Sequence, residues 1–190
     1  MSRPLLTLAS GSPRRQEILE SLGISFAVVP ADIDETPLDG ESPGDTVVRV
    51  ALAKARAVAA QVPGPVLGGD TEVVLNGEVF GKPVDEAEAL AMLAKLSGRK
   101  HTVLTAVALV ADGNESTALS TTEVVFRDVG PDEARRYWQS GEPRDKAGAY
   151  AIQGLGGVFV EAIEGSYSGV VGLPVFETAG LLREAGIWQL

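Results

Sequence analysis

The stretch LLTLASGSPRRQEILESLGISFAVV, residues 5–29, decides the fold class because it joins two apolar runs through a helix with clear end signals. The apolar run at its start predicts a short buried strand. Ser12 is a good N-cap, Pro13 suits the first helical position, and Gly23 is typical of the residue that ends a helix. The apolar run at 24–29 predicts a second strand.

Helical and strand patterns continue to interleave along the rest of the chain. Asn76-Gly77 between two apolar runs also signals a type I′ hairpin. Hairpins beside interleaved helices predict a mixed α/β (or α+β) sheet rather than a purely parallel one. Further strands are expected at 66–69, 73–75, 78–80, 102–110, 117–127, 147–153 and 158–163, and helices at 43–60, 87–96, 131–140 and 174–185.

Composition narrows the class of protein. The chain has 190 residues, which is the size of one large domain or two small lobes. Its content of 45% hydrophobic and 22% charged residues argues against disorder. A net charge of −10 disfavours nucleic acid as a partner. The absence of cysteine and the single histidine, His101, exclude disulfides, thiolate metal sites and multi-histidine metal sites. With neither a signal peptide nor a membrane span expected, we predict a cytoplasmic protein.

The segment SGSPRR, residues 10–15, places two serines and two arginines at a predicted helix start. If Ser12 caps the helix, Arg14 and Arg15 occupy its first turn, where cations oppose the helix macrodipole at a cost of up to about 1 kcal/mol. A bound phosphate would reverse this effect, because the first N–H groups, the Ser10 hydroxyl and both guanidiniums would converge on it. The alternative is that both arginines lie in solvent and pair with glutamates of the same helix.

Lys54 lies on the apolar stripe of the helix predicted at 43–60. A lysine on such a face either extends its ammonium group to solvent or meets an anion. The stripe around it consists of Val47, Val50, Ala51 and Val58.

The segment GGDT, residues 68–71, puts Asp70 directly after a short predicted strand. Carboxylates at such a position often hold a divalent cation or accept a proton from water, although a turn or capping aspartate is an equal alternative. Lys82, in GKP after the hairpin, is either a further ligand-binding cation or an ordinary surface lysine.

The segment YAIQGLGG, residues 150–157, runs from a predicted strand into a glycine-rich bend. Such a bend can bring the backbone close to a ligand, and Gln153 offers a donor and an acceptor suited to a base edge. The spacing is wrong for a dinucleotide fingerprint, and a plain hairpin is the alternative. Together, the four segments suit a nucleotide with a polyphosphate tail and a divalent cation.

In this order, the motifs resemble the Maf family of nucleoside triphosphate pyrophosphatases. LASGSPRRQEIL, RVALAKAR, GGDT, GKP, SGEPRDKAGAYAIQGLGG and VVGLP cover nearly the whole chain. The chain differs from the family pattern at Gly69, where alanine is usual, and at Glu72, where an apolar residue is expected.

The resemblance implies hydrolysis of a nucleoside triphosphate to the monophosphate and pyrophosphate with Mg²⁺ or Mn²⁺. It also implies a single domain, residues 1–190, of two lobes with a central cleft as in the inosine-triphosphatase-like fold, usually forming a homodimer. Asp70 would accept the water proton and, with Glu35, bind metal. Arg14, Thr71 and Gln153 match the branch that prefers dTTP and UTP. The residues expected to bind substrate are Ser10, Ser12, Arg14, Arg15, Lys54, Thr71, Lys82 and Gln153.

Two other functions would use the same charged residues. A nucleotidyltransferase would need a second, acceptor substrate, and a nucleotide-sensing regulator of cell division would bind the nucleotide without consuming it.

Overall fold

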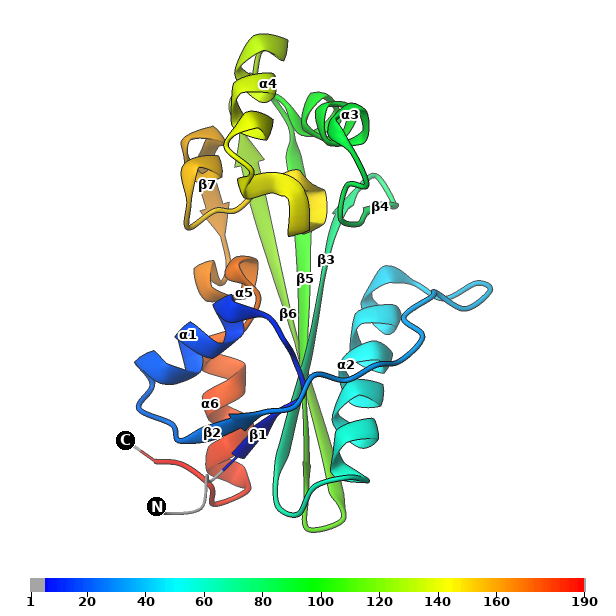
Figure 1. The fold of residues 1–190 in the computed structure, drawn as a ribbon, viewed down its shortest axis with the longest axis vertical. Coiled ribbons are helices and arrows are strands. Elements are labelled where there is room, and N and C mark those ends of the chain that lie inside the picture. Colours follow the sequence, from blue (N-terminus) through cyan, green and yellow to red (C-terminus); the bar gives the residue numbers. More distant parts are fainter. Residues whose placement is uncertain (1–5, 190) are drawn as a thin grey trace. The chain divides into compact units, whose positions relative to one another are not determined.

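The computed structural model describes residues 6–189. It contains a seven-stranded sheet with the hydrogen-bonded order β2-β1-β3-β5-β6-β7, and β4 pairs with β3 (Figure 1). β1 runs parallel to β2 and β3, whereas the β3–β4 and β6–β7 pairs are antiparallel. The predicted mixed α/β fold is therefore confirmed.

The chain forms two compact units, which are described one at a time. Unit 1 holds the described parts of Met1–Asp70, Thr105–Ser120 and Gly172–Leu190, and unit 2 holds Thr71–Leu104 and Thr121–Val171.

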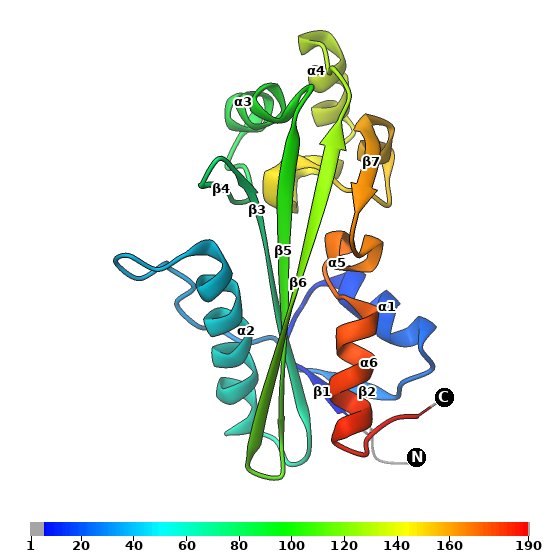
Figure 2. The same ribbon diagram turned by 180° about the vertical axis from the view of Figure 1, so that it is seen from behind.

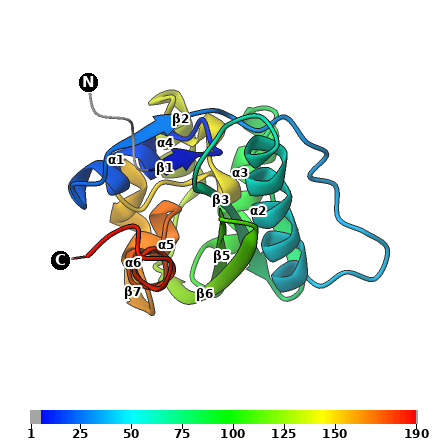
Figure 3. The same cartoon turned by 90° about the horizontal axis from the view of Figure 1, so that it is seen from below.

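The helices of unit 1 cover both faces of its strands: α2 lies on one side, and α1 and α6 lie on the other (Figure 3). On the α1 and α6 side, Leu19 and Leu182 pack with Leu8 and Leu67 in one fully buried cluster. The elements are β1 (Leu6–Leu8), α1 (Pro13–Ser21), β2 (Phe26–Val28), α2 (Pro43–Ala59), the start of β3 (Val66–Leu75), the end of β5 (Lys100–Ala111), the start of β6 (Asn114–Phe126) and α6 (Val175–Glu184).

The helix ends of unit 1 follow the sequence signals. Pro13 opens α1 directly after Ser12, and Gly23 takes a left-handed φ of 68° just beyond its end. At the start of α2 the Ser42 hydroxyl accepts the Asp45 N–H at 3.2 Å. The first predicted strand is confirmed from Leu6, while its residue 5 lies outside the described residues.

In unit 2, α3 and α4 lie beside one another (Figure 2). The core of this unit is rich in aromatic side chains. The Asp85 carboxylate caps α3 by accepting the Glu88 N–H at 2.9 Å. Further elements are β4 (Glu78–Phe80), α3 (Glu86–Leu96), α4 (Pro131–Gln139), β7 (Val160–Glu164) and α5 (Tyr167–Val171), the last of which the sequence did not indicate.

Two predictions of local structure were wrong. The segments predicted as strands at 66–69 and 73–75 form one strand, β3, so Asp70 lies in mid-strand instead of at a strand end. The segment predicted as a strand at 147–153 and a hairpin contains no strand. Gly148 and Ala149 take left-handed φ values of 68° and 57°, which break extended structure. Short 3₁₀ turns at Glu142–Asp145, Ala147–Ala149 and Leu155–Phe159 form instead.

His101 belongs to the core of unit 2. It is 2% exposed, its Nε2 lies 2.9 Å from the Tyr150 hydroxyl, and its ring meets Phe126 edge-on at 4.9 Å between centroids. Burial lowers the pKa of His101 from 6.5 to about 4, because the charged imidazolium is poorly solvated there.

This burial predicts an acid-dependent loss of stability. Between pH 6.5 and about 4 the unfolded chain takes up a proton at His101 that the folded chain does not. Proton uptake at His101 should therefore lower the free energy of unfolding by about 3 kcal/mol across that window, and this contribution should level off below it. Urea unfolding at a series of pH values measures this fall. In His101→Phe this part of the slope should vanish, and an unchanged slope would contradict the assignment.

Candidate functional site

Arg15 is a buried cation held by two hydrogen bonds within unit 1. It is 8% exposed, its Nε donates to the Gly172 carbonyl at 2.8 Å, and its Nη1 donates to Ser10 Oγ at 2.9 Å. Burial lowers the pKa of the guanidinium, and the carboxylate of Asp70 opposes that shift. The alternative that Arg15 lies in solvent is therefore wrong.

Lys54 joins two acidic side chains from different parts of unit 1. Its Nζ lies 3.0 Å from Asp70 Oδ1 on β3 and 2.9 Å from Glu35 Oε2 in the loop between β2 and α2. Lys54 and Asp70 are 8% and 9% exposed, whereas the Glu35 side chain is 52% exposed. The apolar-stripe lysine thus meets anions instead of reaching solvent.

Gly68 explains how α2 comes close enough for this contact. A Cβ at Gly68 would lie 2.2 Å from the Ala51 carbonyl oxygen and 2.9 Å from the Ala55 backbone nitrogen. Lys54 lies between these two residues on α2, and Asp70 points to the same face of β3 as Gly68 because strand side chains alternate. The glycine therefore sets the helix-to-strand distance at which Lys54 reaches Asp70.

Gly69 serves the opposite face of β3. A Cβ there would lie 3.3 Å from Arg15 Nε, so an alanine would force a small shift of the guanidinium. Glycine lets Arg15 lie directly on the strand, next to Asp70. Lys54 and Arg15 thus approach the same short segment of β3 from its two faces, which gathers cations around one carboxylate.

The loop that carries Glu35 is fastened by a pair that the sequence analysis missed. Arg49 of α2 donates to both carboxylate oxygens of Glu41, at 2.6 and 2.7 Å, and to the Thr36 carbonyl at 3.0 Å. These hydrogen bonds, first among them that from Arg49, lower the pKa of Glu41 to about 2. The eight-residue separation of Arg49 and Glu41 follows no helical or strand period, so no local signal marks the pair.

The donor set of Asp70 and Glu35 fits a divalent cation that also binds phosphate. Their oxygens already converge on one positive centre, the Lys54 ammonium group. Residues 6–189 contain no group of three or more acidic or histidine side chains placed to hold a metal. Mg²⁺ commonly uses one or two carboxylates and completes its shell with substrate phosphates and water, which this pair allows.

The other predicted residues occupy less buried positions. In unit 1, Ser12 and Arg14 are half-buried, and the Ser12 hydroxyl makes no capping hydrogen bond although Ser12 is the N-cap residue. In unit 2, Thr71 is half-buried, and Lys82 and Gln153 are exposed.

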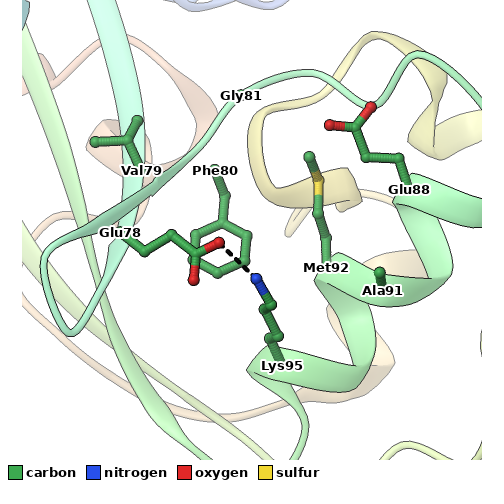
Figure 4. A pocket seen from close by; sticks show the side chains of 8 residues that line it. All are labelled: Glu78, Val79, Phe80, Gly81, Glu88, Ala91, Met92 and Lys95. Atoms are coloured by element: carbon green, nitrogen blue, oxygen red, sulfur yellow. Dashed lines mark hydrogen bonds and ion pairs between the residues drawn. The ribbon is translucent and has the colours of Figure 1, made fainter.

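A depression between β4 and α3 in unit 2 contains none of the predicted site residues that the structure describes (Figure 4). Lys95 points across it to Glu78, with Nζ and Oε1 2.5 Å apart, and lies 5.6 Å from the centroid of the Phe80 ring. The lining of this depression holds one cation, Lys95, and two glutamates, Glu78 and Glu88, so it lacks the second cation that Arg15 provides near Asp70.

The fold and site define a mixed α/β protein in which buried cations surround a carboxylate, an arrangement suited to phosphate ligands. Residues 5–185 match the Maf family, described as Maf-like protein, and the chain belongs to that family. No helix within residues 6–189 has both the length and the apolar character needed to cross a membrane.

Curated relatives and solved structures resemble the chain to different degrees. A dTTP/UTP pyrophosphatase of Methylobacillus flagellatus is 51% identical over 95% of this chain and 92% of its own length. A dTTP/UTP pyrophosphatase of Anaeromyxobacter dehalogenans is 55% identical over 96% of this chain and 95% of its own length. A HAM1 protein from Coxiella burnetii aligns with 64% of this chain and 72% of its own at 22% identity, with a TM-score of 0.48.

Replacing Gly68 by alanine should destabilise the protein because the new methyl group meets the backbone of α2. We expect a loss of at least about 1–3 kcal/mol in the free energy of unfolding, measured by urea denaturation. Gly180→Ala is the matched control, because Gly180 lies inside α6 with nothing near its Cβ position, and it should stabilise by about 0.5–1 kcal/mol. Equal changes in the free energy of unfolding for the two variants would refute the close approach of α2 to β3.

Lys54→Met should destabilise the metal-free protein by about 3 kcal/mol, because Asp70 is left buried without its cation. Lys95→Met provides the control: both members of the Lys95–Glu78 pair are half exposed, so its loss should cost less than about 1 kcal/mol. Urea unfolding in the presence of a chelator measures both. Comparable losses of unfolding free energy in the two variants would show that the contacts of Lys54 contribute no more than an exposed surface ion pair.

Proposed function

We propose that this chain is a nucleoside triphosphate pyrophosphatase that hydrolyses dTTP and UTP to the nucleoside monophosphate and pyrophosphate. The observation that carries the proposal is that the buried carboxylate of Asp70 pairs with the buried ammonium group of Lys54 and interacts electrostatically with the buried guanidinium of Arg15. The dTTP/UTP pyrophosphatases that are 51% and 55% identical over nearly the whole chain support the same substrate class.

The triphosphate binds where the positive groups of unit 1 gather. The first turn of α1 has no acidic residue, and its N-cap hydroxyl makes no hydrogen bond to the helix, so its positive dipole end remains suited to an anion. Arg15 and Ser10 already form one hydrogen-bonded group beside this end. The residues of unit 1 proposed to hold the phosphates are Ser10, Ser12, Arg14, Arg15 and Lys54; Lys82 of unit 2 is also proposed to bind substrate.

The chemical step is the attack of water on the α-phosphorus. The new P–O bond forms as the α–β anhydride bond breaks, pyrophosphate leaves, and Asp70 accepts the proton of the attacking water. The hydrogen bond from Lys54 at 3.0 Å fixes the orientation of the Asp70 carboxylate. Arg15 and Lys54 stabilise the negative charge that grows on the phosphate oxygens.

A divalent cation, Mg²⁺ or Mn²⁺, would be held by Asp70 and Glu35. Bound there, it supplies Lewis-acid polarisation of the phosphate and neutralisation of its charge. The Arg49–Glu41 pair keeps the Glu35 loop in place for this purpose.

The preference for pyrimidine bases is assigned to Arg14, Thr71 and Gln153. The exposed amide of Gln153 offers the donor and acceptor that a uracil or thymine edge requires. We further propose that the protein acts in the cytoplasm as a homodimer whose protomers are single domains of two lobes. Light scattering of the purified protein tests the homodimer.

Incubation with UTP and Mg²⁺ alone separates this function from the two alternatives. Release of UMP and pyrophosphate without an acceptor supports hydrolysis. A requirement for an acceptor indicates a nucleotidyltransferase, and binding of intact UTP indicates a regulator.

Asp70→Asn should lower kcat by about 10²–10⁴-fold, the usual effect of removing a general base, because an amide cannot accept the proton. Asp132→Asn is the control, since the Asp132 side chain is 85% exposed on α4, and its turnover should equal that of the wild type. Pyrophosphate release under saturating UTP measures both. Near-normal turnover in Asp70→Asn would remove Asp70 from this role.

A further inference from the structure

The half-buried carboxylate of Glu142, just after α4, is bound to the loop that carries Gln153. Its Oε2 accepts the Leu155 N–H at 2.9 Å, and its Oε1 accepts the Gly156 N–H at 2.9 Å. The same Oε1 accepts the hydroxyl of Tyr137 at 2.7 Å. One carboxylate thus orders the backbone directly after Gln153.

Tyr137 orders the backbone on the other side of Gln153. Its hydroxyl accepts the Ala151 N–H at 3.0 Å while it donates to Glu142. The ring is 5% exposed and packs edge-on against Phe159, with 5.0 Å between centroids. Gln153 therefore projects from a segment whose backbone is tied, two residues before and two residues after it, to one tyrosine–glutamate pair.

The glycines of GLGG are the residues that this arrangement requires. A Cβ at Gly154 would lie 2.1 Å from Glu142 Oε2, and one at Gly156 would lie 2.5 Å from the Tyr137 hydroxyl. A Cβ at Gly157 would lie 2.6 Å from the Ile152 carbonyl oxygen. The glycine-rich bend thus makes room for the pair and for its own close turn.

The charge state of the pair suits this role. Although burial acts against it, the hydrogen bonds from Tyr137, Gly156 and Leu155 keep the pKa of Glu142 below its usual value. Burial and donation to Glu142 raise the pKa of Tyr137. At neutral pH the carboxylate therefore accepts hydrogen bonds only, and the phenol remains a donor.

We propose that Glu142, together with Tyr137, is a positioning residue that fixes the Gln153 loop and thereby sets selectivity for the pyrimidine edge. This inference rests on the function proposed above and concerns the base, whereas the catalytic chemistry belongs to Asp70. Glu142 contacts the loop backbone and acts on the base through Gln153.

The test uses Glu142→Gln, because an amide turns an NH₂ group toward at least one of the N–H donors and so breaks part of the arrangement. The ratio of kcat/KM for UTP to that for CTP, whose pyrimidine differs at the 4-position, should fall at least about tenfold, since small misplacements at a site can have 10²-fold effects. Gly154→Ala, which keeps the charge but occupies the place of the carboxylate, should lower the same ratio.

A double-mutant cycle separates positioning from general damage. If Glu142 acts through Gln153, adding Glu142→Gln to Gln153→Ala should cause no further loss of the ratio. The control is Glu123→Gln on β6, which alters a partly exposed pair with Lys100 of β5 and should keep the wild-type ratio. Independent, additive losses in the cycle, or a wild-type ratio in Glu142→Gln, would overturn the proposal.

Amide hydrogen exchange gives a readout that does not depend on activity. The Leu155 and Gly156 amides should exchange at least about tenfold faster in Glu142→Gln, while the core amides of β5 stay protected. Unchanged exchange at both loop amides would overturn the proposal by itself. If the wild-type protein does not hydrolyse UTP, or does not prefer UTP to CTP, the proposed function is refuted instead. The hydrogen-exchange comparison would then still decide whether Glu142 fixes the loop.

Discussion

The hydrogen bond that Lys54 donates to Asp70 requires that a helix and a strand of unit 1 lie almost in backbone contact. Gly68 permits that approach, and the backbone of Ala51 and the backbone and small side chain of Ala55 lie against it. Removing two charges from water is costly and is offset only when the geometry is good. Such a pair is therefore weak evidence for stability, and its placement beside Arg15 and Glu35 supports the binding role proposed for it.

The overall acidity of the chain makes this local arrangement informative. With a net charge of −10, the average surface repels phosphate, and a phosphate ligand needs a place where cations dominate. Arg15 and Lys54 bring two buried cations to one short segment of β3, and the divalent cation proposed at Asp70 and Glu35 would give this group a net positive charge. Their burial also limits competition from solvent and salt.

Sequence patterns predicted most elements well where a cap or turn residue has one strong local preference. Ser42, Asp85, Gly23 and Asn76-Gly77 all take the roles that their chemistry favours. Prediction failed at 147–153, where a strand was expected, because contacts from distant residues decided the backbone. Tyr137 holds Ala151, and the Gly81 carbonyl accepts the Gly148 N–H at 3.1 Å.

The candidate residues themselves were identifiable from the sequence, because the motifs that contain them have a family order, although their roles in binding and catalysis stay predictions. The sequence by itself determined the fold class, the helix ends and the chemical types available for a phosphate ligand. Only the tertiary structure decided that Lys54 meets two carboxylates and that Arg15 is buried. It also decided that Arg49 with Glu41 and Tyr137 with Glu142 hold the loops that carry Glu35 and Gln153. The physical reason is that caps and turns depend on neighbours along the chain, whereas these pairs depend on which backbones approach closely enough for side chains to meet.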